Sequence, residues 1–314
     1  MLVPWWFLFP VVGAFCLLVL APILHMVLAP VLADPGAAAK AAAGVFEVRQ
    51  APLILRSLGL GLGTTGLCLA IGVPFAFACT RTDLKLKTVF LWACIVPVLI
   101  PPYIHAIAWM RLDPFLEQAL GFDIHSLPGS ILVLTVAYFP FVILLSAAGL
   151  TGVDAAMEEA SLLHHGGFRT LTRITLPLAF PHIAAGALFV FVFSVINISV
   201  PDFLRVTVYP LEIFIQFSAF YDPFSATLLS IPLLLITMVL IGIQEAVMKQ
   251  RSFIQIHANR SGRISLRLGR LHGPVFLSCL AVILSGSVLP VAILIREAGP
   301  PAGVLGTVKA ASGQ

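Results

Sequence analysis

Seven stretches of this chain hold enough consecutive apolar residues to cross a lipid bilayer as helices. The hydrocarbon core of a bilayer requires about 20 apolar residues per helix. Runs of that kind lie between charged breaks at residues 5–33, 57–79, 88–110, 130–150, 181–204, 224–248 and 274–296. They lack the alternation of apolar and polar residues that marks a membrane β-strand. The sequence therefore predicts an all-α fold, a polytopic transmembrane helical bundle with about seven spans.

The composition supports a membrane protein. Of the 314 residues, 60% are hydrophobic and 10% are charged, whereas soluble domains carry about 25% charged residues. The first apolar run has no basic segment before it and is longer than the core of a signal peptide, so we expect a retained span. The five cysteines lie inside predicted spans without CxxC spacing, which favours a packing role; they are Cys16, Cys68, Cys79, Cys94 and Cys279.

The positions of lysine and arginine predict the orientation of the chain. Alternate loops hold 11 of the 18 basic residues, and loops rich in lysine and arginine stay in the cytoplasm. The N-terminus is therefore predicted to be cytoplasmic. Topology also explains the net charge of +4, so no nucleic-acid partner is expected. The cytoplasmic set is Arg81, Lys85, Lys87, Arg169, Arg173, Lys249, Arg251, Arg260, Arg263, Arg267 and Arg270.

One polar stretch interrupts the apolar runs between the fourth and fifth spans. It reads "EEASLLHHGGFRTLTRITLPLAFP" at residues 158–181. Capping-box spacing of Thr151 and Asp154 predicts a short helix after them, which Gly166 and Gly167 should end. A second short helix should follow and stop at Pro177. An amphipathic loop lying on lipid is one interpretation, but adjacent acids and arginines favour a protein partner.

This stretch resembles the EAA loop of binding-protein-dependent ABC importer permeases. That pattern is EAA, three residues, glycine, nine residues and I-x-L-P, and the chain matches it at Glu158 or Glu159, Ala160, Ile174, Leu176 and Pro177. The match departs at the glycine position, where His164 or His165 stands and glycines follow only at 166 and 167. The resemblance implies a loop that docks on an ATPase.

Two further segments, residues 80–109 and 202–236, resemble the ferric-iron type of these permeases, which has thiamine and aminoethylphosphonate relatives. The resemblance covers about residues 50–250. It implies the type I ABC importer permease fold and a multi-pass location in the bacterial inner membrane. The implied partners are a cytoplasmic ABC ATPase dimer, a periplasmic or extracellular solute-binding protein and a second permease module. The implied solute is ferric iron, with thiamine, phosphonate or polyamine as alternatives.

The resemblance assigns the ATPase-coupling role to the loop at 152–180. ATP-driven closure of the ATPase must move the two adjoining spans, so the loop has to be stiff. The expected coupling residues are Glu158, Glu159, Ala160, Gly166, Gly167, Arg169, Arg173, Ile174, Leu176 and Pro177.

Polar or helix-breaking residues inside spans are costly in hydrocarbon and point to a translocation pathway. Prolines in "PVLIPPYIHAIAW" should break the third span near its middle and free carbonyl groups. The pathway candidates are Pro101, Pro102, Tyr103, Tyr138, Ser194, Asn197 and Asp202, with Thr64, Thr65, His105 and Ser199 as weaker ones. A lone histidine does not make a metal site, so no metal and no cofactor are expected.

The chain is expected to divide into four parts. Residues 1–55 hold the first span and an external linker, 56–250 the permease core, 251–273 a cytoplasmic basic linker and 274–314 the first span of a second, truncated module. The restart rests on "VKAASG" at 308–313, which echoes "AKAAAG" at 39–44; chance similarity is the alternative. The basic linker offers only Phe253 for stacking on bases, which argues against nucleic acid.

Two other classes remain as alternatives. An ion-coupled secondary transporter should carry buried carboxylates, yet Asp202 and Glu245 are the only acids near a span and both stand at span ends. A membrane enzyme should cluster its histidines, which are scattered here. The GxGxxG at 61–66 lies inside a span rather than between a strand and a helix, so it does not indicate a dinucleotide site. ATP hydrolysis is therefore expected in a partner subunit.

Overall fold

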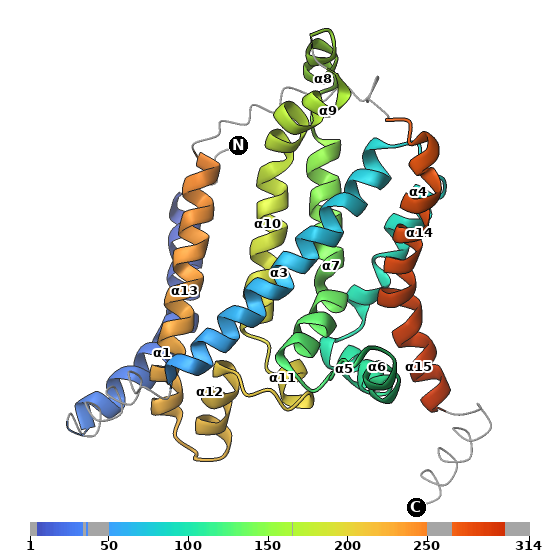
Figure 1. Cartoon of the computed structure of the whole chain (residues 1–314). Coiled ribbons are helices and arrows are strands. Elements are labelled where there is room, and N and C mark those ends of the chain that lie inside the picture. Colours follow the sequence, from blue (N-terminus) through green and yellow to red (C-terminus); the bar gives the residue numbers. More distant parts are fainter. Residues whose placement is uncertain (1–4, 34–35, 37–49, 165, 250–265, 299–314) are drawn as a thin grey trace, which may run out of the picture. The chain divides into compact units, whose positions relative to one another are not determined.

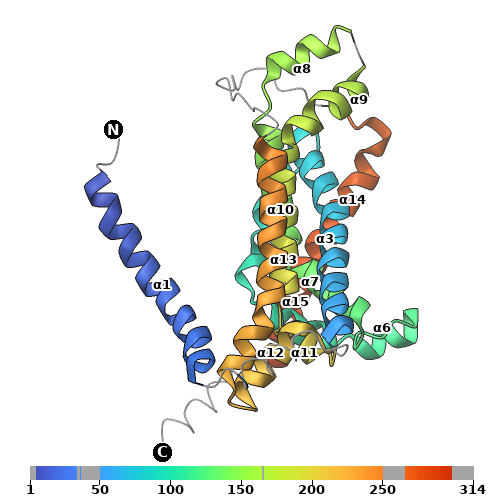
Figure 2. The same ribbon diagram turned by 90° about the vertical axis from the view of Figure 1, so that its left-hand side faces the viewer.

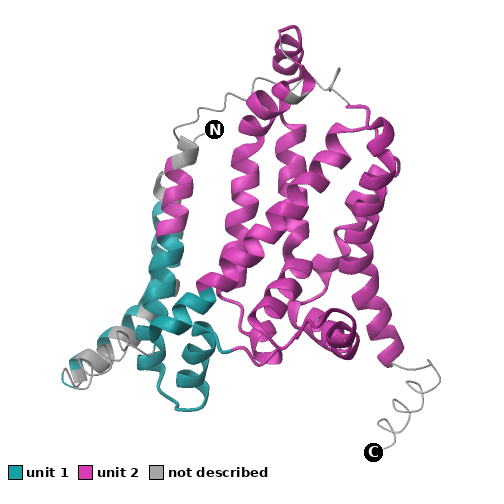
Figure 3. Cartoon of the chain, in the orientation of Figure 1, with its two compact units in different colours: residues 1–57, 207–238 teal, residues 58–206, 239–314 magenta. Residues whose placement is uncertain are grey.

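The computed structural model describes residues 5–33, 36, 50–164, 166–249 and 266–298. These residues form helices and turns (Figure 1). The β-structure among them is limited to one isolated bridge between Thr82 and Leu266. The all-α prediction is confirmed. The chain divides into two compact units, residues 1–57 with 207–238, and residues 58–206 with 239–314 (Figure 3).

The predicted spans correspond to observed helices. The first run forms α1 (Trp5–Ala33). Five helical segments of the described residues are long and apolar enough to cross a membrane: α3 (Gln50–Arg81), α7 (Leu127–Thr151), η2 with α10 (Leu171–Val195), α13 (Pro223–Ala246 of a helix ending at Lys249) and η3 to α15 (Gly269–Glu297). A bent helix pair adds up to one more span. The membrane bundle expected from sequence is thus confirmed.

The first unit joins the beginning of α3 to α12 (Tyr209–Ser218). The backbone N–H of Tyr209 donates to Ser57 Oγ at 2.9 Å, and both residues are buried. Asp222 caps the beginning of α13, because its Oδ1 accepts from the backbone N–H of Ser225 at 3.0 Å. These two bonds satisfy amide groups that a helix start leaves without intrahelical partners.

The core of the second unit forms where α7 and α10 (Leu176–Val195) pack along each other. Small residues allow the close approach: a Cβ on Gly149 would stand 2.6 Å from His182 Cβ, and one on Gly72 of α3 would stand 2.8 Å from Val142 Cγ1. Membrane helices use such small residues for packing because lipid provides no hydrophobic drive between them. The buried core includes Leu60, Leu134, Ile143, Leu150 and Val190.

The third predicted span is broken rather than straight. Helix α4 (Lys87–Ala93) and η1 (Val96–Leu99) lead to a bend of 93° before α5 (Pro102–Met110). Proline lacks the N–H that a helix interior requires, and Pro97, Pro101 and Pro102 stand at the break. The break that the prolines predicted is confirmed, and in place of one straight helix at 88–110 the structure has two helical pieces that meet at the bend.

The fifth predicted span begins earlier than expected and ends earlier. The segments α9 (Gly167–Thr170), η2 (Leu171–Thr175) and α10 follow one another without a gap, so Pro177 does not stop a helix. Pro177 lies in the first turn of α10, where a missing N–H is tolerated. The segment before it, η2, is a π-turn, in which each hydrogen bond spans five residues instead of four. The span ends at Val195, and α11 (Ser199–Phe203) turns away from it.

The loops of the second unit gather at two opposite ends. Helices α8 (Ala155–Leu162) and α9 lie at one end, while α5, α6 (Asp113–Leu120) and α11 lie at the other, as both views show (Figures 1 and 2). Helix α9, which carries Arg169 of the predicted cytoplasmic set, therefore lies at the end opposite to α6, which begins at Asp113. The charge asymmetry of the sequence is also a separation in space.

The last span belongs to the second unit and packs on α4 and α5. It consists of α14 (His272–Ile283), the π-turn η4 (Leu284–Val288) and α15 (Leu289–Ala298). Ser287 Oγ donates to the carbonyl of Ala93 at 2.9 Å, and the ring centroids of Phe276 and Phe90 lie 5.3 Å apart. That residues 274–314 begin a second module stays a prediction, and both echoing motifs, at 39–44 and 308–313, lie outside the described residues.

Candidate functional site: the loop at 152–180 and the opposite end

The loop at 152–180 contains the short helix predicted from its capping residue. Asp154 Oδ1 accepts from the backbone N–H of Ala156 at 3.0 Å, and α8 follows. The other residue of the expected capping box, Thr151, is the last residue of α7. Helix α8 ends at Leu162, before the two glycines, and Gly167 is the first residue of α9. His165 lies outside the described residues.

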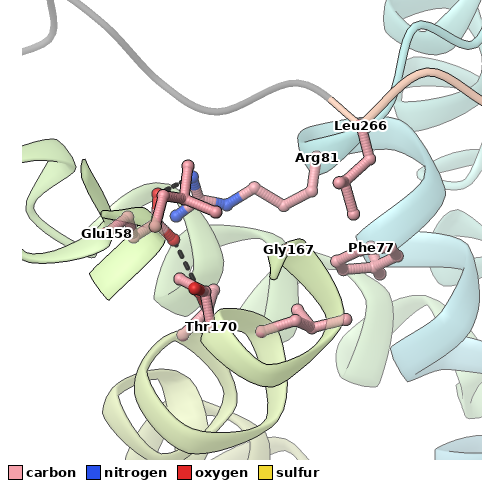
Figure 4. Close-up of a pocket in the computed structure, with 9 residues that line it drawn as sticks. Phe77, Arg81, Glu158, Gly167, Thr170 and Leu266 are labelled. Atoms are coloured by element: carbon pink, nitrogen blue, oxygen red, sulfur yellow. Dashed lines mark hydrogen bonds and ion pairs between the residues drawn. The ribbon is translucent and has the colours of Figure 1, made fainter. Parts of the chain in front are cut away.

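A buried ion pair anchors α8 to the end of α3. Glu158 Oε2 lies 2.8 Å from Arg81 Nη1, and the two side chains are 2% and 3% exposed. Thr175 Oγ1 donates to Glu158 Oε1 at 2.7 Å, and Arg81 Nη2 donates to the carbonyl of Leu150. Both carboxylate oxygens are thus occupied inside the chain, as Figure 4 shows for the pair. Charge-assisted bonds of this kind are stronger than neutral ones.

A small cavity of about 20 Å³ adjoins the pair. This volume admits about one water molecule. Figure 4 shows Leu266 on the side of Arg81 away from Glu158, with Phe77 and Gly167 nearby. A Cβ added to Gly167 would stand 3.2 Å from Leu266 Cδ2, whereas one added to Gly166 would meet no atom within 4 Å. The lining residues are Phe77, Arg81, Glu158, Leu162, Gly167, Thr170, Leu171, Thr175 and Leu266.

The remaining predicted coupling residues lie mainly at the surface. Ile174 and Pro177 are partly buried; Glu159, Ala160, Gly166, Arg169, Arg173 and Leu176 are exposed. Two large apolar side chains are exposed beside them, Met157 at 52% and Leu163 at 84%. The loop therefore presents both signs of charge and apolar surface together, while Glu158 faces inward.

Several residues that fasten the loop were not predicted from sequence. Ser161 Oγ and Thr170 Oγ1 lie 3.0 Å apart and connect α8 to α9. Arg81, Thr175 and Leu266 complete the anchor. Arg81 carried only a topology signal, because a basic residue at a span end is common on the cytoplasmic side. Nothing in the local sequence marks it as the partner of Glu158, 77 positions away.

The opposite end brings some of the predicted pathway residues together. Asn197 Nδ2 donates to Tyr138 Oη at 3.1 Å, and Asn197 Oδ1 accepts from the backbone N–H of Val200 at 2.9 Å. The rings of Tyr103 and Phe203 stack with centroids 6.4 Å apart. Helices α5, α7 and α11 meet here.

The other pathway candidates differ in position and in burial. Pro101 and Pro102 stand at the bend before α5, and Asp202 is exposed on α11. Ser194 is buried in α10. Among the weaker candidates, Ser199 is exposed, Thr64 is buried and Thr65 partly buried on α3, and His105 is buried with Nε2 3.4 Å from the carbonyl of Pro97.

Three potential metal ligands also meet at that end: Asp113 is the first residue of α6, and Asp123 and His125 lie in the turn between α6 and α7. Ligand atoms of Asp113, Asp123 and His125 lie within 4.8 Å of one another. The two carboxylates accept from the backbone N–H groups of Ile124 and His125, and His125 Nδ1 lies 3.5 Å from Asp113 Oδ2. These bonds give the cluster a role in shaping the turn.

Comparison with known proteins identifies a family and several similar proteins. The family model for the "binding-protein-dependent transport system inner membrane component" matches residues 69–249, more than half of the chain. The chain is 30% identical over 132 residues to the probable molybdenum ABC transporter permease protein of Haloferax volcanii, covering 41% of this chain and 49% of that protein. It is 30% identical over 142 residues to the molybdate/tungstate transport system permease protein of Pyrococcus abyssi, covering 44% and 55%.

A solved structure shares the fold. The MetNI methionine ABC transporter in inward-facing conformations superposes with a TM-score of 0.53 at 16% identity, over 64% of this chain and 94% of that one. The chain spans about half the length of the curated relatives it matches. Both of those relatives are named for molybdenum, molybdate or tungstate, so the comparisons do not support the ferric-iron type expected from sequence.

Proposed function

The chain belongs to the family of inner membrane components of binding-protein-dependent transport systems, and from this premise we propose that it is the permease subunit of an ATP-driven importer. The observation that carries the proposal is the loop at 152–180. Its inner side is held by the buried pair of Arg81 and Glu158, and its outer side presents exposed charges and apolar groups. A loop built in this way suits docking on a soluble partner.

The partner in this proposal is a cytoplasmic ABC ATPase dimer. Glu159, Arg169 and Arg173 are exposed and can pair with charges across an interface, while Met157 and Leu163 can fill an apolar groove. Glu158 acts as a positioning residue, because Arg81 and Thr175 already occupy its oxygens. Gly167 leaves room for Leu266, whereas Ala160, Gly166, Ile174, Leu176 and Pro177 contribute to the shape of the dock.

Force would reach the membrane through α9, η2 and α10. These segments are consecutive from Gly167 to Val195, so a displacement of α9 is passed to a transmembrane helix without a flexible joint. Binding of the ATPase can drive this displacement only if its contacts differ in free energy between two conformations. At the far end of the unit, the proposed path passes Tyr138, Ser194 and Asn197, with Pro101, Pro102, Tyr103 and Asp202 around them.

We propose an oxyanion of the molybdate or tungstate class as the solute. Support comes from the names of two relatives from different organisms. An external binding protein would select the oxyanion, and the permease would provide the path. The proposal includes a second permease module, a multi-pass location in a bacterial inner membrane, a cytoplasmic side at α8 and α9, and the four-part division of the chain at residues 55, 250 and 273.

The test is co-purification followed by uptake. The tagged permease should bring down an ABC ATPase from membranes of its own host, and its loss should abolish accumulation of molybdate measured by mass spectrometry of cell extracts. Double charge reversal at Arg169 and Arg173 is the matched variant: it should abolish ATPase capture while the protein still inserts. Uptake that persists without ATP hydrolysis and follows an ion gradient would reject the proposal in favour of a secondary transporter. Uptake of another solute with ATPase capture intact would reject only the oxyanion.

A further inference from the structure

The segment that leads into the last span lies against the loop at 152–180. Its described part begins at Leu266, which forms a parallel bridge with Thr82 at the end of α3. The backbone N–H of Leu266 donates to the carbonyl of Arg81 at 2.9 Å, and its own carbonyl accepts from the N–H of Asp83 at 3.3 Å. Two residues later, the N–H of Leu268 donates to Asp83 Oδ1 at 2.9 Å.

The first of these three bonds uses a group that a helix end leaves available. The last carbonyls of an α-helix have no intrahelical donor, and Arg81 is the last residue of α3. Leu266 supplies the donor for its carbonyl. The segment at 266–268 is therefore attached to the same residue whose guanidinium holds Glu158, and the last span follows at His272.

The side chain of Leu266 reaches the other side of the anchor. It lines the small cavity with Arg81, Glu158 and Gly167 (Figure 4). Its Cδ2 would stand 3.2 Å from a Cβ on Gly167, which is tighter than most such contacts. Leu266 thus contacts both α3 and the loop.

We propose that Leu266 and Leu268 form a clamp which fixes the loop at 152–180 to the last span, so that the loop and that span respond to the ATPase as one body. This inference rests on the proposed function of the loop as the ATPase dock. Leu266 is the positioning residue and acts through Arg81 and Gly167. The last span is held along its length by Ser287 and Phe276, so it has the rigidity that a shared movement requires.

The first experiment measures the clamp in the permease alone. Hydrogen exchange of residues 155–175 is followed in nanodiscs for Leu266→Ala and for Leu271→Ala, a leucine of the same segment that is 63% exposed and outside the cavity. Leu266→Ala should raise exchange of the loop about tenfold, because local opening follows local packing, and Leu271→Ala should not. Leu266→Met keeps the volume and should restore protection. Equal exchange in both alanine variants would overturn the inference.

The second experiment measures coupling in the assembled transporter. Leu266→Ala should retain the ATPase yet lower solute moved per ATP hydrolysed by about fivefold, at the low end of typical coupling effects. Asp83→Ala, which removes the acceptor for Leu268 without entering the cavity, should act in the same direction. An unchanged ratio in both variants would overturn the clamp. A wild-type permease that captures no ATPase would reject the proposed function instead, and hydrogen exchange would still decide whether the clamp exists.

Discussion

Arg81 and Glu158 lie 2.8 Å apart at Nη1 and Oε2, although 77 residues separate them and both side chains are almost fully buried. The pair joins the end of a membrane span to a loop in which Glu159, Arg169 and Arg173 are exposed. Buried pairs are costly to form and more costly to break, because one remaining partner keeps its desolvation penalty. This asymmetry leads to the first prediction.

Removing one partner of the pair should lower the free energy of unfolding more than removing both. Glu158→Leu leaves the Arg81 guanidinium buried without its carboxylate and should destabilise the protein by about 3–5 kcal/mol. Arg81→Met with Glu158→Leu should recover most of that loss, since both charges are gone. Thermal unfolding in nanodiscs of the two single variants and the double variant measures the cycle. Additive losses would show that the two side chains do not interact.

The exposed arginines of the loop should matter for coupling rather than for folding. Arg169→Glu with Arg173→Glu should leave membrane insertion and thermal stability unchanged within about 0.5 kcal/mol, as is usual for surface substitutions. Uptake and ATPase retention should be lost. Lys85→Glu changes an exposed charge at the same end and serves as the control. Normal uptake in the double variant would contradict the docking role.

Gly149 should tolerate no side chain. An added methyl group would stand 2.6 Å from His182 Cβ and 3.0 Å from the carbonyl oxygen of Ala179, so α7 and α10 would have to separate. Gly149→Ala should destabilise the fold by about 1–3 kcal/mol, as overpacking does. Gly66→Ala is the control, because a methyl group there meets no atom within 4 Å. Equal melting temperatures for the two variants would refute the packing.

Asn197 should contribute more than its partner Tyr138 to the local stability of the end that holds α5 and α11. Asn197→Leu removes two hydrogen bonds, to Tyr138 Oη and from the N–H of Val200, whereas Tyr138→Phe removes one. Leaving buried groups unsatisfied costs about 1–3 kcal/mol each. Hydrogen exchange at Val200 should rise in Asn197→Leu and stay close to wild type in Tyr138→Phe. A rise of the same size in both variants would assign the effect to packing.

The cap of α13 should weaken in acid. The pKa of Asp222 is lowered from its ordinary value of 3.8, chiefly by the side-chain and backbone hydrogen bonds from Ser225. A lowered pKa means that the folded state favours the carboxylate, so the stabilisation is present above pH 3.8 and is lost as the pH falls through the folded pKa.

Asp222→Ala should therefore speed hydrogen exchange at the beginning of α13 at neutral pH, by an amount that corresponds to about 1 kcal/mol. In strong acid, the variant and the wild type should converge. Asp222→Asn keeps an acceptor and should remove the dependence on pH. A wild-type cap that is equally protected on both sides of its pKa would contradict the ionised cap.

The sequence by itself determined the membrane class and the approximate number of spans. The reason is that a bilayer requires every backbone group of a span to be hydrogen-bonded within the helix. Each apolar run can therefore be recognised as a span independently of the others. The helix start at Asp154 could also be predicted from the sequence, because a cap is a contact between near neighbours in the chain.

Only the tertiary structure decided which distant groups meet. Arg81 is a topology signal in the sequence and the partner of Glu158 in space, and Gly167 is a helix breaker in the sequence and a space for Leu266 in the fold. Pro177 reads as a stop, yet it lies in the first turn of α10, which follows the π-turn η2 without a gap. These outcomes depend on the neighbours that packing brings together, and no run of consecutive residues contains that information.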